Sequence, residues 1–198
     1  MEVKDFYSQE AVAAGYRARS AWKLRQIDDK YKFISPSRYI LDLGAAPGSW
    51  SQVAKQRAPA AKILACDLVE VKPIRNVIML TGDFHKEVTP AKVEELLGSP
   101  TVDLLLSDMS PSLTGNSIRD QALMLELGLG VLDKARDLLN QATGTLLIKM
   151  FQGSELQEFI QSLKDDGYKH KVIKPAASRS NSKEIYIMAS KRESATTK

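Results

Sequence analysis

The stretch Tyr39–Trp50, YILDLGAAPGSW, constrains the fold of this 198-residue chain more than any other. Apolar residues suited to a buried strand come first, a turn of small residues runs from Gly44 to Gly48, and a helix-like pattern resumes at Ser49. This order is the opening unit of nucleotide-binding α/β sheets, in which glycines let a ligand approach the backbone and the helix start offers free N–H groups. Asp42 adds a carboxylate beside the turn. The stretch therefore predicts a nucleotide-like cofactor.

The composition, with 43% hydrophobic and 26% charged residues, is ordinary for a soluble globular protein. The length suffices for a single core, which we expect over residues 1–190, followed by a flexible tail at 191–198. No apolar run approaches the roughly 20 residues of a membrane helix, and the first residues lack the apolar core of a signal peptide. The single cysteine, Cys66, excludes an intrachain disulfide and disfavours a cysteine-based zinc site. We expect a cytoplasmic protein with no metal and no membrane partner.

The two ends of the chain are basic, whereas the middle is acidic. Residues 1–38 carry 8 Lys and Arg against 5 Asp and Glu, residues 168–198 carry 8 against 2, and residues 39–167 carry 12 against 17. Basic ends on an acidic middle favour a polyanionic partner such as nucleic acid. Solvated surface charge is the alternative, and for the last residues, KRESATTK, it is the better explanation.

Hydrophobic periodicity predicts strands that alternate with helices. The strands are expected at 39–43, 62–66, 77–80, 102–106, 145–150, 168–173 and 184–189. The helices are expected at 8–15, 19–29, 49–57, 89–97, 118–140 and 154–163. Such alternation predicts a largely parallel sheet with helices on both faces. Only a short loop joins the last two strands, so these two should pair antiparallel.

Polar residues recur at the carboxyl ends of the predicted strands, at Asp42, Asp67, Asp83, Asp108 and Lys149. This edge of an open α/β sheet is where ligands bind. One aspartate in such a place is commonly a helix cap, but one after each of the first four strands favours a binding site. Asp67 follows Gly48 by 19 residues, which matches the position of an acidic residue that binds a ribose diol in these folds.

Lys149 stands inside the apolar run TLLIKMF, and two explanations are open. Its amine either reaches solvent at the strand end or is partly buried beside a partner. Burial lowers the pKa of a lysine, and a neutral lysine can serve as a base near neutral pH. Lys23, on a helix with an apolar stripe, and Glu184, at the start of the last strand, are ordinary surface charges by default. Pattern alone does not connect either of them to Lys149.

Seven segments, in this order along nearly the whole chain, resemble the FtsJ/RrmJ family of S-adenosylmethionine-dependent RNA ribose 2′-O-methyltransferases. They are GYRARSAWKL (15–24), LDLGAAPGSWSQVA (41–54), ACDL (65–68), GDF (82–84), SDMSPSLTG (107–115), IKMFQG (148–153) and KPAASRSNSKEIYI (174–187). Each segment alone is a weak signal, but together they make chance very improbable.

The resemblance implies a Rossmann-like, seven-stranded methyltransferase sheet, mostly parallel with an antiparallel last strand. It implies S-adenosylmethionine as the cofactor, bound through Gly44, Gly48, Trp50, Asp67, Asp83 and Asp108. It also implies a catalytic set made of Lys23, Asp108, Lys149 and Glu184, in which Lys149 is the general base for a ribose 2′-hydroxyl. Two residues that pattern left unconnected thus join the pair at the strand ends.

The resemblance further implies an RNA substrate and a monomeric enzyme. The segments 107–115 and 174–187 are most similar to bacterial members that modify a uridine of large-subunit rRNA. The branch that modifies the tRNA anticodon loop shares the segments at 15–21 and 45–50 and is the alternative. The candidate RNA contacts are Arg17, Arg19, Lys174, Arg179 and Lys183.

Two other classes of protein remain as alternatives. A dinucleotide-dependent oxidoreductase would prefer a Gly-x-Gly-x-x-Gly turn, from which the turn at 44–48 departs. A catalytically silent RNA-binding module would not need all four catalytic residue types, and the chain retains them. The sequence therefore predicts an RNA ribose methyltransferase.

Overall fold

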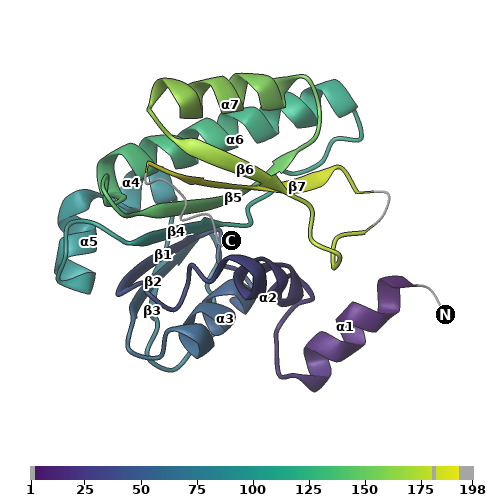
Figure 1. Cartoon of the computed structure of the whole chain (residues 1–198). Helices are drawn as coiled ribbons and strands as arrows, with labels where there is room; N and C mark the ends of the chain where they lie inside the picture. Colours follow the sequence, from purple (N-terminus) through teal and green to yellow (C-terminus); the bar gives the residue numbers. More distant parts are fainter. Residues whose placement is uncertain (1–2, 180–181, 192–198) are drawn as a thin grey trace.

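A computed structural model describes residues 3–179 and 182–191, without the side chains of residues 3–5. Its centre is one seven-stranded sheet with the strand order β3-β2-β1-β4-β5-β7-β6 (Figure 1). The strands are β1 (Tyr39–Leu43), β2 (Lys62–Asp67), β3 (Ile78–Thr81), β4 (Leu104–Ser107), β5 (Thr145–Phe151), β6 (Lys169–Ile173) and β7 (Glu184–Ser190). The predicted α/β sheet of seven strands is confirmed.

The strand order reverses beside β1, and this reversal positions the site. β1 pairs in parallel with β2 on one side and with β4 on the other, so the chain moves outward to β3 and then returns to β4. In the register, Leu43 lies opposite both Cys66 and Ser107. A crevice at the carboxyl ends of strands at such a switch point is the usual ligand site of open α/β sheets.

β7 is inserted antiparallel between β5 and β6, as the short loop before it predicts. The register places Lys149 opposite Tyr186 and Phe151 opposite Glu184. Because β7 runs against its neighbours, its first residues lie at the same edge of the sheet as the last residues of β5. Glu184 is thus brought to the carboxyl edge although it begins its strand.

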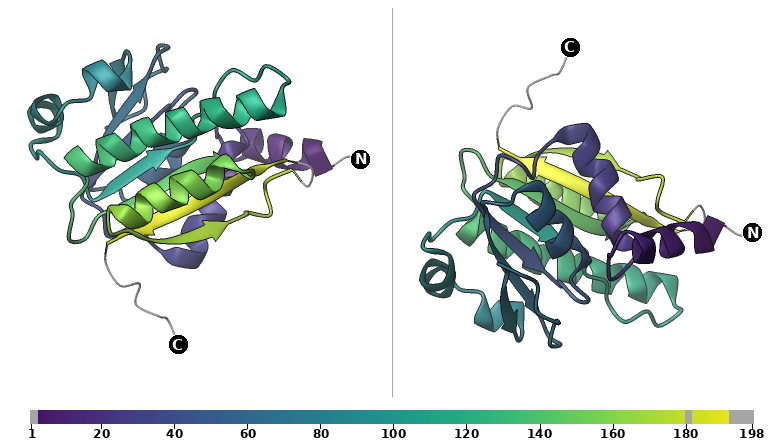
Figure 2. Two further views of the ribbon diagram at one scale, coloured as in Figure 1. Left: turned by 90° about the horizontal axis from the view of Figure 1, so that it is seen from above. Right: turned by 90° about the horizontal axis from the view of Figure 1, so that it is seen from below.

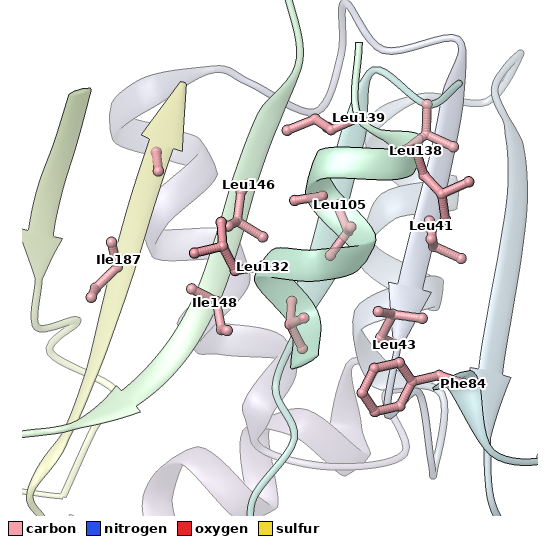
Figure 3. Packing of buried hydrophobic residues seen from close by; sticks show 14 of the residues in the cluster. Leu41, Leu43, Phe84, Leu105, Leu132, Leu138, Leu139, Leu146, Ile148 and Ile187 are labelled. Carbon is pink, nitrogen blue, oxygen red and sulfur yellow. The ribbon is translucent and has the colours of Figure 1, made fainter. Parts of the chain in front are cut away.

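Helices cover both faces of the sheet (Figure 2). On one face α2 and α3 pack with the core residues Leu24, Ile27 and Val53, and α1 lies beside α2. On the other face α5, α6 and α7 enclose a larger core that includes Phe159. Leu105 and Leu132 belong to the same core (Figure 3). The helices are α1 (Val3–Ala13), α2 (Ser20–Tyr31), α3 (Ser49–Arg57), α4 (Phe84–Glu87), α5 (Pro90–Leu97), α6 (Ser117–Leu138) and α7 (Glu155–Asp165).

Caps explain where the helices nearest the site begin. Asn116 caps α6 by accepting hydrogen bonds from the N–H groups of Ile118 and Arg119. Asp83 caps α4 by accepting one from the N–H of His85. The sequence analysis did not predict α4, since a single turn of four residues has too little periodicity to stand out.

The structure differs from the expected boundaries mainly at the N-terminus, where α1 begins at Val3 and ends at Ala13 rather than covering 8–15. The flexible tail predicted at 191–198 lies outside the described residues, except for Lys191. Among the helices in the described ranges, none combines the length and the apolar character needed to cross a membrane.

Candidate active site

Two pockets open at the carboxyl edge of the sheet, and Ser110 lines both. The larger, about 620 Å³, lies beside the ends of β1, β2 and β4 and takes in Gly44, Asp67, Asp83 and Asp108. The smaller, about 540 Å³, includes Lys23, Phe151, Arg179, Lys183 and Glu184 in its wall. Both volumes fall within the range of small-molecule sites, roughly 300–1,000 Å³.

Asp67 is held rigidly at the wall of the larger pocket. Its Oδ2 accepts a hydrogen bond from the N–H of Ala46 at 2.8 Å, and its Oδ1 accepts one from the N–H of Val69 at 3.0 Å. The carboxylate therefore ties the turn after β1 to the loop after β2. It remains half-buried, so a ligand in the pocket can still reach it.

The glycines of the turn have close neighbours within the protein itself. Both have positive φ, and a Cβ on Gly44 would overlap the side chain of Met109. A Cβ on Gly48 would lie 2.7 Å from Nη1 of Arg17 and 2.9 Å from Cδ1 of Ile74. Gly44 lines the larger pocket, whereas Gly48 faces away from it. The structure thus gives a reason for Gly48 that the sequence analysis did not: it leaves room for Arg17.

Arg17, a predicted RNA contact, is bound to the backbone around the turn. Its guanidinium donates hydrogen bonds to the carbonyl oxygens of Pro47 at 2.9 Å, Lys72 at 2.6 Å and Pro73 at 2.9 Å. Its own N–H donates to Oε1 of Gln52 on α3. Arg17 therefore ties the segment before α2 to the turn after β1 and to the loop after β2.

Trp50, a predicted cofactor contact, has its indole in the core rather than in the larger pocket. The residue is 2% exposed, its Nε1 donates to the carbonyl of Ser20 at 3.0 Å, and its ring lies 5.6 Å from the ring of Tyr186. Trp50 does not line the larger pocket, so the cofactor contact that the resemblance implies for it remains a prediction.

Four charged side chains that are far apart in the sequence meet between the two pockets. Nζ of Lys149 lies 2.7 Å from the carbonyl oxygen of Asp108, 3.4 Å from Oδ1 of the same residue and 3.9 Å from Oε1 of Glu184. Nζ of Lys23 lies 2.8 Å from Oε2 of Glu184. The structure therefore brings all four predicted catalytic residues together, from α2, the end of β4, β5 and β7.

Burial and charge oppose one another at this cluster. Both lysines are buried, Lys149 at 5% exposure and Lys23 at 8%. Burial raises the pKa of Glu184, but the hydrogen bond from Lys23 and the charges of both lysines outweigh it, so this pKa lies below its usual value. Glu184 is therefore ionised at neutral pH and orients the two amines.

Tyr186 belongs to this cluster, although the sequence analysis did not select it. Its hydroxyl donates a hydrogen bond to Oδ1 of Asp108 at 2.8 Å, and the side chain is fully buried. Burial, together with the charge of Asp108, raises the pKa of Tyr186 well above its usual value, so the hydroxyl stays a donor. The sequence could have pointed to Tyr186, because it follows Glu184 by two residues in the same strand and therefore lies on the same face of the sheet.

Asp42 lies behind the larger pocket and is buried in β1. Ser51 Oγ donates a hydrogen bond to its Oδ2 at 2.6 Å. Burial, aided by the charges of Asp108 and Asp67 and opposed by the Ser51 bond, raises the pKa of Asp42 to about 7. Half of this carboxyl is therefore protonated near neutral pH.

The five predicted RNA contacts do not share one surface. Arg19, Arg179 and Lys183 line the smaller pocket, where Arg19 donates to the carbonyl of Ala177 and Lys183 to the hydroxyl of Ser117. Lys174 is exposed and donates to the carbonyl of Ser182. Three of the five thus line the pocket beside the charged cluster, while Arg17 lies at the turn after β1.

Asp42 gives the folded protein a pH dependence that can be measured. The pKa of Asp42 rises on folding, so its contribution to the free energy of unfolding is fully present below pH 4 and is lost as the pH rises to about 7. The free energy of unfolding falls by up to about 4 kcal/mol over this range. We expect Asp42→Asn to remove this part of the pH dependence, when the free energy of unfolding is measured at each pH by urea unfolding followed by circular dichroism. The control is Asp137→Asn, at an exposed position of α6. If the free energy of unfolding changed with pH in the same way for wild type and Asp42→Asn between pH 4 and 7, Asp42 would not be the source of the pH dependence.

Comparison with known proteins agrees with this geometry. Proteins named ribosomal RNA large subunit methyltransferase E are 42% identical over 187 residues in Azoarcus sp. (94% of this chain, 91% of the relative) and 41% identical over 194 residues in Methylobacillus flagellatus (98% and 93%). The crystal structure of a ribosomal RNA methyltransferase from Plasmodium falciparum superposes with a TM-score of 0.77 at 31% identity, covering 88% of this chain and 97% of that one. The family model for FtsJ-like methyltransferases matches residues 16–192. The chain therefore belongs to the FtsJ-like methyltransferase family.

Proposed function

We propose that this protein transfers a methyl group from S-adenosylmethionine to a ribose 2′-hydroxyl of large-subunit rRNA. The observation that carries the proposal is the position of Lys149, which contacts Asp108 of the larger pocket and Glu184 of the smaller one. A methyl donor and a hydroxyl acceptor must meet at one point, and Lys149 contacts a lining residue of each pocket. The relatives named as large-subunit rRNA methyltransferases support the choice of RNA.

The larger pocket suits S-adenosylmethionine, which supplies a methyl group on a positively charged sulfur. Its lining includes four carboxylates, those of Asp67, Asp83, Asp108 and Glu126. Asp108 would attract the positive end, Asp67 would accept hydrogen bonds from the ribose diol, and Asp83 would lie near the base. The family match to methyltransferases favours this cofactor over a dinucleotide.

Lys149 acts as the general base and takes the proton of the ribose 2′-hydroxyl, which is a poor nucleophile while it is protonated. The carboxylates around the amine are already engaged, since Tyr186 donates to Asp108 and Lys23 donates to Glu184. Nζ of Lys149 therefore lies farther from both carboxylate oxygens than from the carbonyl oxygen of Asp108. The hydrogen bond to this carbonyl fixes the position of the amine. Lys23 and Glu184, in the wall of the smaller pocket, orient the sugar.

The positioning of the two reactants accounts for much of the expected rate acceleration. Holding two reactants at the distance and angle of attack can supply on the order of 7–11 kcal/mol of the barrier in favourable cases. Proton transfer to a well-placed base adds about 100- to 10,000-fold. The monomeric state and the cytoplasmic location expected from the sequence remain predictions.

The substrate is tested by offering several RNAs together with cofactor labelled in the methyl group. We expect label in the rRNA of undermethylated large ribosomal subunits, on a 2′-oxygen mapped by mass spectrometry. Label in tRNA instead would support the anticodon-loop alternative. Binding of large subunits without transfer to any RNA would support the silent RNA-binding module and overturn the proposal.

Lys149→Ala separates chemistry from binding in the same assay. The single-turnover rate should fall by about 100- to 10,000-fold because the base is lost. The dissociation constant for S-adenosylmethionine, measured by calorimetry, should change little. Lys164→Ala, at an exposed position of α7, is the matched control. A Lys149→Ala protein with the wild-type rate at saturating substrate would show that Lys149 is not the base.

Tyr186→Phe tests a positioning role, because it removes only the hydroxyl that donates to Asp108. A hydrogen bond to a charged group is worth about 1.5–3 kcal/mol, so kcat should fall by at least about tenfold. The effect should nearly vanish in a Lys149→Ala background, since the two residues act as a unit. Equal losses of kcat in both backgrounds would mean that Tyr186 contributes only to packing.

Salt dependence separates the basic residues that contact RNA from those that hold the fold. For Arg179→Ala and Lys183→Ala we expect weaker binding of large subunits. The slope of the logarithm of the binding constant against the logarithm of the salt concentration should become shallower by about 0.7–0.9 for each variant. Arg17→Ala should leave this slope unchanged, because its guanidinium is bound to backbone carbonyls. A shallower slope for Arg17→Ala alone would reverse this assignment.

A further inference from the structure

The smaller pocket has apolar walls directly beside its charged residues. Phe151, half-buried at the end of β5, lies opposite Glu184 in the strand register. Leu113, in the loop that follows β4, also lines the pocket and is 66% exposed, so its side chain is available for apolar contact. The aromatic side chain and the exposed leucine therefore belong to the same cavity.

The rim of this cavity is built in advance by a set of hydrogen bonds. Lys183 and Gln121 both donate to the hydroxyl of Ser117, at 2.8 and 3.1 Å, and Oε1 of Gln121 accepts from the N–H of Ser154 at 3.1 Å. A Cβ on Gly153 would overlap the side-chain amide of Gln121. The loop before β7, the start of α6 and the loop after β5 are thus joined around the cavity.

The loop before α6 is fixed in the same way. Oδ1 of Asp120 accepts hydrogen bonds from both the N–H and the hydroxyl of Thr114, each at 2.7 Å. Hydrogen bonding to the loop lowers the pKa of Asp120, so this carboxylate stays charged and keeps its bonds. Leu113 is therefore carried by a loop that is anchored to α6.

The chemistry of this cavity fits a nucleobase. A flat aromatic side chain and a leucine offer stacking and apolar contact, hydroxyls and an amide supply hydrogen bonds, and Arg179 and Lys183 at the entrance suit phosphates. The backbone link between Lys149 and Phe151 is only two residues long, so a ribose at the Lys149 amine has its base within reach of Phe151. A base paired inside a duplex could not enter a cavity of this kind.

We propose that the smaller pocket binds the nucleobase of the target nucleotide, turned out of the RNA, stacked on Phe151 and covered by Leu113. This inference rests on the proposed function, because it assigns the base attached to the ribose that is methylated. Phe151 and Leu113 then select an unpaired nucleotide, and their contacts hold the 2′-hydroxyl at Lys149.

The test combines variants of the pocket with removal of the base. Large subunits are reconstituted from rRNA that carries the target ribose, once mapped, either with its base or as an abasic site. Single-turnover methyl transfer is measured with wild type, Phe151→Ala, Phe151→Tyr and Leu113→Ala. Ile118→Ala is the matched control, because Ile118 is 76% exposed nearby and does not line the pocket.

On the intact target, Phe151→Ala should lower kcat/KM by about 5- to 100-fold, the range for a stacked base. Phe151→Tyr should restore most of it, and Leu113→Ala should show a smaller loss. On the abasic target, wild type and Phe151→Ala should react at the same rate, within about twofold. The Ile118→Ala control should match wild type on both RNAs.

Two results would overturn the inference. One is an equal loss for Phe151→Ala on intact and abasic targets, which would mean that Phe151 only supports the fold. The other is an equal wild-type rate on both targets. If circular dichroism shows that Phe151→Ala does not fold, the test relies on Leu113→Ala and on the wild-type rates for the intact and abasic targets. Failure of the proposed function would look different, since wild type would then methylate neither RNA.

Discussion

The contact between Lys149 and Asp108 is the interaction on which the rest of the site depends. A buried amine beside the carbonyl and carboxylate of Asp108 is tolerable only because every group around it has a partner. Tyr186 holds the other side of the Asp108 carboxylate, and Lys23 holds Glu184. The cluster thus fixes one amine in contact with a lining residue of each pocket.

The segment before α2 joins the two halves of this site. Arg17 is bonded to the turn after β1 and to the loop after β2, and Trp50, at the start of α3, is bonded to the carbonyl of Ser20. A few residues further along the chain, Lys23 reaches Glu184. The turn after β1 and the residues proposed to orient the ribose therefore share one rigid support, which keeps two reactants in a fixed relation.

Much of the fold was predictable from the sequence, because local patterns carry it. Strand and helix alternation predicted the sheet, and the short loop before Glu184 predicted an antiparallel last strand. The site was predictable only in part. Asp67, Asp83 and Asp108 line the larger pocket as expected. The burial of Trp50 and the backbone bonds of Arg17 were not expected, since a residue type indicates what a side chain can do and not which neighbours it finds.

The sequence by itself determined the class of fold, the edge of the sheet at which both pockets open and, through its resemblance, the family. These follow from periodicity of 2 and 3.6 residues and from the order of short motifs. Only the tertiary structure decided that Tyr186 supports Asp108, that Arg17 serves the turn and that Phe151 faces a second pocket. Each of these contacts joins residues far apart in the chain, and their distances are set by how strands and helices pack, which no local pattern encodes.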